Sequence, residues 1–421
     1  MDQAANASGD RVGQSRRDQH TFRGNRESTR HGWLRLTPAY SVRLVAELLA
    51  ALPNARGPVL DPFCGTGTTL LSCSEHAVDC DTTDINPFLV WLARAKVADY
   101  SEAELSLARA GLDQLAKATR RSRSRGLWTP PLHQIEKWWS AATLGALARA
   151  HAALEEFARG SSQPAADLLR IAFCQALIER SRAHFGHQSM SFEPGSKNAP
   201  VASDPSDVSH VVQSLSSAFE RLAGPAARRL PDTRRRALQI DARRLHEQLP
   251  ARHYTAVITS PPYANRMSYI RELRPYMYWL KYLEQRKDAG VLDWLAIGGT
   301  WGSATSNLSS WAPTAGQRIG GDLEQRLAAI AEESPVLSTY VRKYFHDMSA
   351  HVASVERVLQ RGGSVRYVVG NSKFYDVVVP VQDWLGAEFE RAGFGSVEVR
   401  ALRKRTSKKE LYEYLVSAEL G

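Results

Sequence analysis

Short apolar segments recur along the chain, separated by longer amphipathic stretches. Four of them have the length and composition of buried strands, at residues 59–63, 80–85, 237–241 and 256–259. A fifth, at 364–369, follows a long amphipathic helix and a predicted turn at Gly362 and Gly363. Because helical patterns alternate with these strands, we expect an α/β fold with a Rossmann-like, doubly wound and mostly parallel sheet.

Two further patterns flank this sheet. Apolar residues recur at helical spacing over 44–52, and this predicted helix leads into the first strand. Alternation over 397–402, followed by the apolar stretch 411–416, predicts an antiparallel hairpin at one edge of the sheet.

The domain organisation follows from where the patterns change. Residues 1–30 have almost no large apolar side chains, which predicts a disordered basic tail. Residues 31–100 and 231–421 carry the α/β pattern, whereas 101–230 is mostly helical and too long for a simple crossover. We expect this stretch to be an insertion with its own small core, anchored by Trp138 and Trp139. A second insertion, irregular in structure, is expected at 290–321.

Composition indicates a large folded protein. The chain has 421 residues, of which 43% are hydrophobic. It has no apolar run near the roughly 18 residues of a membrane span, and its first residues are polar, so we expect a cytoplasmic protein. The spacing of the four cysteines, Cys64, Cys73, Cys80 and Cys174, fits neither a zinc site nor a disulfide scaffold. They are expected to be reduced thiols, and no metal is expected.

The formal net charge of +10 fits a polyanionic partner, because lysines and arginines gain affinity by neutralising phosphates. Net charge alone is weak evidence, since many basic proteins bind no nucleic acid.

A glycine-rich turn follows the first predicted strand. Gly65 and Gly67 allow the backbone to approach a ligand closely and to present amide groups at a helix start. Such a turn at the end of a parallel strand is the usual site of a nucleotide-like ligand. The candidate contacts in this segment are Asp61, Phe63, Gly65, Thr66, Gly67 and Thr68.

Two more acidic residues follow strands at the same expected edge. Asp84, followed by Ile85 and Asn86, ends the second strand where a carboxylate would accept hydrogen bonds from ribose hydroxyls. Asp241, followed by Ala242, could accept a hydrogen bond from an adenine amino group. Capping of the next helix is an equally good explanation for Asp241.

The predicted strand ending at Thr259 runs into Ser260, Pro261, Pro262 and Tyr263. Ser260 has a hydroxyl acceptor, and Pro261 has a carbonyl whose direction the next proline fixes. Such acceptors can hold the hydrogens of an amine whose lone pair is delocalised into a ring. Tyr263 has an aromatic face on which a planar ring could stack, a contact of about 1–3 kcal/mol.

Together, the Asp61–Thr68 segment and the Ser-Pro-Pro-Tyr segment resemble the two motifs of amino-group DNA methyltransferases. His31 to Ser41 is similar to the family segment that wraps the methionine end of the cofactor, with Tyr40 and Ser41 as contacts. Further family-like segments lie at 269–271, 279–280, 357–359 with Gly362 and Gly363, and 369–372. The resemblance implies S-adenosyl-L-methionine as cofactor, double-stranded DNA as substrate, and the catalytic domain at 31–100 plus 231–421.

The Ser-Pro-Pro-Tyr form resembles enzymes that methylate cytosine at N4, whereas forms beginning with Asp or Asn are mostly N6-adenine enzymes. The expected function is therefore a site-specific cytosine-N4 DNA methyltransferase that flips its target base, with a cognate restriction endonuclease as a candidate partner. The alternatives are an N6-adenine enzyme and an inactive nucleic-acid-binding protein of the same fold.

DNA contacts outside the reacting base are expected from basic segments. The run Arg120, Arg121, Arg123 and Arg125 could hold phosphates, although a solvated face is the commoner explanation. The loop 403–409 is expected near the catalytic cleft, with a role at the DNA backbone. His184 and His187 lack a ligand partner at suitable spacing, so we expect structural or DNA-contacting roles. The helical insertion 101–230 is the candidate recognition region.

Overall fold

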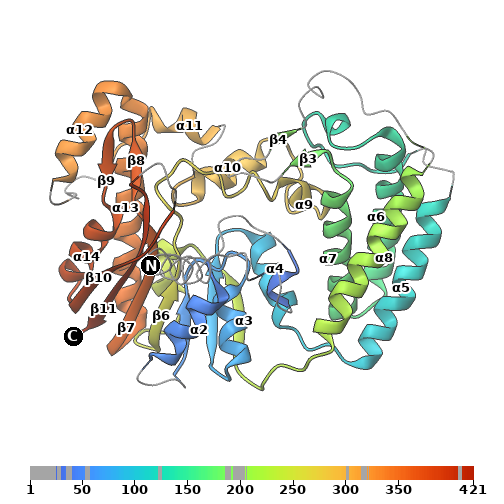
Figure 1. Ribbon diagram of the computed structural model, residues 1–421, viewed down its shortest axis with the longest axis horizontal. Coiled ribbons are helices and arrows are strands. Elements are labelled where there is room, and N and C mark those ends of the chain that lie inside the picture. Colours follow the sequence, from blue (N-terminus) through green and yellow to red (C-terminus); the bar gives the residue numbers. More distant parts are fainter. Residues whose placement is uncertain are drawn as a thin grey trace, which may run out of the picture.

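A seven-stranded, mostly parallel sheet forms the centre of the computed structural model, with strand order β10-β11-β7-β6-β1-β2-β5 (Figure 1). Strand β11 runs antiparallel to both of its neighbours, and the other pairs are parallel. The strands are β1 (Val59–Asp61), β2 (Cys80–Asp84), β5 (Arg235–Gln239), β6 (Tyr254–Thr259), β7 (Leu359–Gly370), β10 (Phe394–Lys404) and β11 (Tyr412–Leu420). The structure describes residues 25, 30–34, 40–52, 57–121, 126–184, 191–192, 204, 206–299, 303–313, 320, 322–405 and 410–421.

Helices cover both faces of the sheet, so successive residues of a central strand enter different cores. Val59 and Ile258 pack with helices α2 (Val42–Ala50), α3 (Thr68–Glu75) and α4 (Pro87–Val97) on one face. Leu60 and Val257 pack on the other face with 3-10 helix η4 (Ala242–Glu247), α13 (Pro335–Val358) and α14 (Val381–Arg391). The alternation follows from the two-residue period of a strand, and it confirms the doubly wound α/β fold.

The strand order reverses between β1 and β6. From β1 the chain adds β2 and then β5 on one side, and it returns to place β6 on the other side of β1. In open α/β sheets, ligands bind outside the carboxyl ends of the strands at such a reversal. Asp61 ends β1 and Ser260 follows β6, so the two predicted motifs meet at this point.

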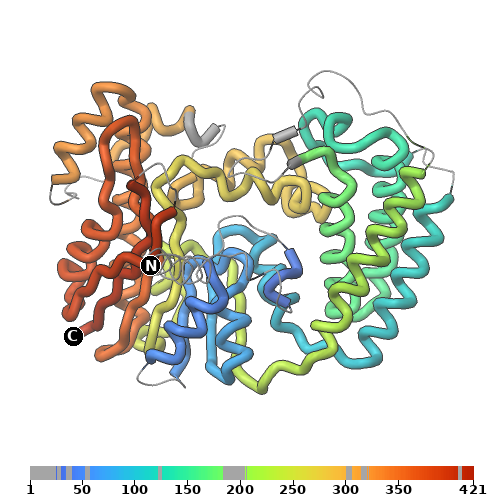
Figure 2. Tube along the Cα trace, viewed as in Figure 1, coloured from blue at the N-terminus to red at the C-terminus, as the bar shows by residue number. Residues whose placement is uncertain are grey.

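Four long helices between β2 and β5 pack together at the right of Figure 1. They are α5 (Glu102–Arg120), α6 (Ala141–Arg159), α7 (Gln163–Glu179) and α8 (Asp207–Ala226). Figure 2 shows the chain returning from α8 to the sheet along the lower edge of the view. Trp138 and Trp139 are buried among these helices, as expected for core anchors.

The helical region does not have a separate core, contrary to the sequence prediction, but shares one with helices of the α/β domain. The same apolar cluster contains Phe88 and Trp91 of α4 and residues of α9 (Arg274–Trp279), which follows the Ser-Pro-Pro-Tyr segment. Trp279 lies 6.0 Å from Trp139, measured between ring centroids. The helices are therefore packed directly on the α/β domain.

Several predicted boundaries need correction. The first three strands end one or two residues earlier than predicted, and β7 begins five residues before Ser364, at Leu359. Gly362 and Gly363 lie inside β7 as an irregularity in its pairing with β6, where Gly362 has a φ of 73°, and not in a turn before the strand. The hairpin of β10 and β11 is confirmed.

The segment predicted to be irregular at 290–321 contains helices. They are α10 (Asp288–Leu295) and α11 (Ser303–Leu308), and α12 (Leu323–Glu333) follows. The remaining short elements are η2 (Arg30–Gly32), η3 (Ile135–Lys137), β3 (Ala183–His184), β4 (Ser191–Phe192), β8 (Ser372–Phe374) and β9 (Val377–Val379). All four cysteines are buried free thiols, as predicted. In the described part of the chain, no helix is both long enough and apolar enough to cross a membrane.

Candidate active site

The glycine turn joins β1 to α3 in a backbone conformation that other residues rarely adopt. Gly65 has a φ of 51° and Gly67, at the start of α3, a φ of 77°. A Cβ atom on Gly67 would lie only 3.0 Å from the Cβ atom of Ala93 on α4. The two helices therefore approach each other closely at the turn, and glycine is required there for both reasons.

Asp61 supports this turn from inside the protein. Its side chain is fully buried, and its Oδ1 accepts hydrogen bonds from the amide of Phe63 at 3.1 Å and from the hydroxyl of Thr259 at 2.6 Å. Burial raises the pKa of Asp61 to about 7. The carboxyl group thus ties the glycine turn to the last residue of β6, immediately before Ser260.

Asp84 holds the turn from the side of β2. One carboxylate oxygen accepts from the amide of Gly65 at 3.1 Å, and the other accepts from the amide of Asn86 at 2.9 Å. Burial raises the pKa of Asp84 to about 6. Asn86 in turn caps α4, since its side-chain oxygen accepts from the amide of Phe88 at 3.0 Å. Ile85 lies between them, partly exposed, and Thr66 and Thr68 are buried.

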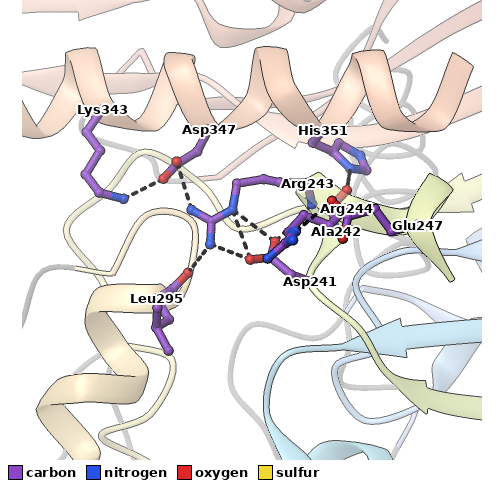
Figure 3. A network of polar contacts seen from close by, with 9 residues as sticks. All are labelled: Asp241, Ala242, Arg243, Arg244, Glu247, Leu295, Lys343, Asp347 and His351. Atoms are coloured by element: carbon purple, nitrogen blue, oxygen red, sulfur yellow. Dashed lines mark hydrogen bonds and ion pairs between the residues drawn. The ribbon is translucent and has the colours of Figure 1, made fainter. Parts of the chain in front are cut away.

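Asp241 is held by its neighbour Arg243 (Figure 3). Its carboxylate caps η4 by accepting from the amide of Arg243 at 2.9 Å, and it also pairs with the guanidinium group at 2.6 Å. Burial alone would raise the pKa of Asp241, but the hydrogen bonds and charge of Arg243 lower it below its ordinary value. The capping explanation considered from the sequence is confirmed.

Arg243 connects Asp241 to two other elements, as Figure 3 shows. Its guanidinium group donates to Asp347 of α13 at 2.9 Å and to the carbonyl of Leu295, at the end of α10, at 2.8 Å. His351 of α13 bonds to the carbonyl of Ala242 at 2.9 Å. The sequence analysis did not identify Arg243, because an arginine in a short helix has no distinguishing pattern.

The Ser-Pro-Pro-Tyr segment leaves the end of β6 and is fixed on both sides. The hydroxyl of Ser260 donates to the carbonyl of Val368 on β7 at 3.0 Å, while Asp61 bonds the preceding Thr259. Ser260 and Tyr263 are partly buried and Pro261 is buried. Burial raises the pKa of Tyr263, and a hydrogen bond with Ser260 acts against that shift. The two side chains proposed for catalysis therefore lie in contact.

Three tyrosines hold the backbone of this segment: Tyr269, which belongs to one of the family-like segments, and Tyr340 and Tyr344, which the sequence analysis missed. Tyr269 bonds the amide of Tyr263 through its hydroxyl at 2.7 Å, and Tyr344 donates to the carbonyl of Pro262 at 3.0 Å. The hydroxyl of Tyr340 accepts from the amide of Arg266 and donates to the carbonyl of Gly298, both at 3.2 Å. Tyr340 and Tyr344 are spaced i,i+4 on one face of α13, but core aromatics have the same spacing.

Tyr40 and Ser41 lie beside the helix that begins at the glycine turn. The hydroxyl of Tyr40 hydrogen-bonds to that of Thr69 on α3. Ser41 is buried at the start of α2. The segment that contains Tyr40 therefore contacts the helix that follows the glycine turn.

Lys96 is a second charged residue that the sequence analysis missed. Its side chain is buried at the end of α4, where its Nζ atom donates to the carbonyls of Thr66 at 2.9 Å and His31 at 3.1 Å. Burial lowers the pKa of Lys96 to about 7. Lys96 thus connects the glycine turn, through Thr66, to the segment that precedes Tyr40, through His31.

A cavity of about 380 Å³ is lined by residues of the segments 265–266 and 371–375, together with Leu337, Arg405 and Leu411. The guanidinium carbon of Arg405 is 5.1 Å from the ring centroid of Tyr263, and Arg405 is also part of the cavity wall. The predicted closeness of the 403–409 loop to the catalytic segment is confirmed for Arg405, whereas 406–409 lie outside the described residues.

The other residues proposed for DNA contacts are only partly described. Arg120 and Arg121 are exposed at the end of α5, and Arg123 and Arg125 lie outside the described residues. His184 belongs to the short strand β3, and His187 also lies outside the described part of the chain.

Comparison with protein families supports the first half of this site. Residues 42–123 match the family described as D12 class N6 adenine-specific DNA methyltransferase. The matched stretch runs from α2 to just beyond α5, so it includes the glycine turn and Asp84 and stops before the Ser-Pro-Pro-Tyr segment.

The chain is also similar to proteins named Type II methyltransferase M.AvaI from Nostoc sp. and from Anabaena variabilis. It is 31% identical to each over 68 residues, which are 16% of this chain and 14% of each relative. Among solved structures, rRNA methyltransferase aviRa from Streptomyces viridochromogenes aligns over 90% of this chain and 86% of its own, with 13% identity and a TM-score of 0.26. That structural likeness is too low to support an argument.

Proposed function

We propose that this chain is an S-adenosylmethionine-dependent methyltransferase that modifies an exocyclic amino group of a DNA base. One observation carries the proposal. The glycine turn and the Ser-Pro-Pro-Tyr segment leave adjacent parallel strands at the strand-order reversal, and Asp61 and Thr259 join them through a 2.6 Å hydrogen bond. Cofactor and amine would therefore meet in one cleft.

The residues around the cleft fit the cofactor. A side chain at Gly65 would meet nothing closer than the carbonyl of Phe63 at 3.9 Å, so the turn is open there, while Asp84 ends β2 and Asp241 follows β5. We assign the ribose to Asp84 with Ile85 and Asn86, and the adenine to Asp241 with Ala242. The methionine end is assigned to the glycine turn and the segment before α2, through Tyr40, Ser41, Asp61, Phe63, Gly65, Thr66, Gly67 and Thr68.

When bound, S-adenosylmethionine supplies a methyl group activated by a sulfonium. The residues of this chain would orient the acceptor amine and accept hydrogen bonds from its N–H groups. The Ser260 hydroxyl and the Pro261 carbonyl accept from the amine hydrogens, which directs the nitrogen lone pair toward the methyl group. Tyr263 stacks on the base, whose amine must first leave the duplex because it is otherwise out of reach.

The target base has two candidates. Ser260 favours cytosine N4 through the resemblance of Ser-Pro-Pro-Tyr to the cytosine-N4 form. The family that matches 42–123 is described as N6 adenine-specific, which favours adenine. That stretch excludes 260–263, the residues that would contact the base, so we keep cytosine N4 as the first choice and adenine N6 as the second.

We assign catalysis to residues 31–100 and 231–421, and recognition of the DNA sequence to the helical region 101–230. Packing of that region against α4, which follows Asn86, and against α9, which follows the Ser-Pro-Pro-Tyr loop, supports this assignment. The net charge of +10 fits double-stranded DNA as substrate. A cognate restriction endonuclease would be the natural partner of a site-specific enzyme.

Mass spectrometry of nucleosides tests the proposal. DNA is incubated with the enzyme and with S-adenosylmethionine carrying a deuterated methyl group, then digested to nucleosides. Labelled N4-methylcytosine supports the first choice, and labelled N6-methyladenine supports the second. DNA binding with no labelled nucleoside of either kind would instead identify an inactive nucleic-acid-binding protein.

A further inference from the structure

The cavity at Arg405, whose guanidinium group contacts the ring of Tyr263, is lined by three cationic side chains from three separate segments. Arg266 comes from the end of the catalytic loop, Lys373 from β8 and Arg405 from the end of β10. None of the ten residues lining the cavity is acidic. We propose that this cavity binds a phosphodiester of the target DNA strand, directly beside the flipped nucleotide. The inference rests on the proposed function and names the part of the substrate that this cavity holds.

The cations of the cavity have spare capacity for an anion. Arg266 is exposed. Lys373 pairs with Asp376 at 3.1 Å, but Asp376 is fully exposed, and exposed ion pairs contribute little. Arg405 donates from one nitrogen to the carbonyl of Asn371, and a guanidinium group has five N–H donors. A phosphate oxygen would accept charge-assisted hydrogen bonds from these groups.

The walls of the cavity are held in place before any ligand binds. Asn371 is buried and connects both walls. Its backbone carbonyl accepts from Arg405 at 3.0 Å, its side-chain Nδ2 donates to the carbonyl of Glu410 at 3.0 Å, and its side-chain oxygen accepts from the amide of Tyr412 at 2.7 Å. Gly370 allows Arg405 and Tyr263 to pack on the strand end, where a Cβ atom would lie 2.7 Å from the Arg405 Nη1 atom. Such preorganisation lowers the entropic cost of binding.

The position of the cavity identifies which phosphate it would bind. A base that stacks on Tyr263 remains covalently linked to its own backbone. Its flanking phosphates must therefore pass close to the loop that carries Tyr263, and Arg266 lies three residues further along that loop. Arg405 contacts the Tyr263 ring itself, so the base-stacking surface and the cation cluster are continuous.

Charge-neutralising variants test the proposal. Arg266→Gln, Lys373→Gln and the double variant are compared with Arg361→Gln, an exposed cation at the opposite end of β7. Binding of duplex DNA is measured by fluorescence anisotropy over a range of salt concentrations. The double variant is expected to bind about tenfold or more weakly and to lose about 1 from the log–log salt slope for each phosphate contact removed. The Arg361→Gln variant should bind DNA as the wild type does. The affinity for the cofactor should be unchanged in all variants.

A neutral phosphate locates the contact. Once the methylated position is mapped, duplexes carry a single methylphosphonate 5′ or 3′ of the target nucleotide. One of these should weaken binding by the wild type and have no effect on the double variant. If both duplexes weaken binding equally in the two proteins, or the double variant binds like the wild type, the cavity assignment is overturned.

Methyl transfer separates this inference from the proposed function. A wild-type protein that methylates DNA, with variants that bind normally, would refute only the cavity assignment. A wild-type protein that transfers no methyl group but loses affinity on the methylphosphonate duplex would refute the catalytic proposal and keep the phosphate site. In that second case the methylphosphonates are placed at successive positions, because no methylated base marks the target.

Discussion

The hydroxyl of Tyr344 donates a hydrogen bond to the carbonyl of Pro262 across 3.0 Å. Tyr344 is 1% exposed and belongs to α13, far in sequence from the loop it holds. The contact fixes the direction of the backbone between Pro261, whose carbonyl is proposed to accept from the amine, and Tyr263, which is proposed to stack on the base.

Tyr344→Phe should therefore lower kcat without weakening the cofactor. The variant keeps the packed ring and loses one hydrogen bond, worth about 1 kcal/mol, and a loss of that size at the transition state would slow turnover about fivefold to tenfold. Tyr254→Phe is the matched control, since it removes a buried hydroxyl that donates to Asp81 at 2.7 Å, from the first residue of β6. Equal losses of kcat in both variants would show a general stability effect.

Gly370→Ala should impair use of the DNA substrate. A Cβ atom there would lie 3.0 Å from two ring carbons of Tyr263, so the ring must move. Overpacking of this kind costs about 1–3 kcal/mol, and we expect kcat/KM for DNA to fall about tenfold or more, with an unchanged cofactor Kd. Gly395→Ala on β10 is the control because its Cβ would meet open space. Wild-type kinetics in Gly370→Ala would mean that the Tyr263 ring has no fixed role.

Substitutions in the two halves of the site should have separable effects. Ser260→Ala and Tyr263→Ala are expected to retain cofactor binding and to lose most turnover, because both residues are proposed to act on the amine and its base. Asp84→Ala should weaken cofactor binding, since it removes the proposed ribose acceptor and the partner of the Gly65 amide. Calorimetric titration with S-adenosylmethionine and single-turnover methylation measure the two effects. Full activity in Tyr263→Ala would remove the stacking role.

Arg243→Gln should weaken cofactor binding, although Arg243 itself is not assigned to contact the cofactor. Without the guanidinium group, Asp241 and Asp347 lose their shared cation and the carbonyl of Leu295 loses a donor. We expect the cofactor Kd to rise about tenfold, the effect of losing roughly 1.4 kcal/mol. Arg244→Gln is the control, because Arg244 is exposed and pairs with Glu247. If both variants bind alike, Arg243 does not position Asp241.

The sequence allowed prediction of the features that depend on local pattern. The apolar strands, the glycine turn at Gly65 and Gly67, and the position of Ser260 after a strand all follow from residues close together in the chain. The edge hairpin was predictable for the same reason. These patterns determine which residues can meet, since parallel strands bring their carboxyl ends to one edge.

Features that depend on distant contacts were not predictable. Tyr344 resembles any core tyrosine until α13 packs beside the catalytic loop, and Arg243 resembles a solvated arginine until Asp347 is placed opposite it. The shared core of the helical region was missed because a run of apolar helix residues does not reveal which surface covers it. Gly362 and Gly363 were read as a turn, although two glycines are equally compatible with an irregularity inside a strand.

Lys96→Met should change how stability depends on pH. Lys96 is buried, and burial lowers its pKa from 10.5 to about 7 in the folded protein. Between these values the unfolded chain binds a proton that the folded protein does not, so this residue makes the protein more stable as pH rises, by at most about 1.4 kcal/mol per pH unit. Below pH 7 Lys96 is protonated in both the folded and the unfolded state, so the free-energy cost of burying its charge does not change with pH.

The methionine variant has no titrating group at this position. It loses the hydrogen bonds to Thr66 and His31, so its stability at high pH should fall below that of the wild type. Urea unfolding of both proteins from pH 7 to pH 10 gives the difference between their free energies of unfolding. Other titrating groups contribute equally to both proteins, so their contribution cancels in this difference. The free energy of unfolding of the wild type relative to the variant should rise across this range. A constant difference would mean that Lys96 has the same pKa in both states and that the glycine turn rests on a charged lysine.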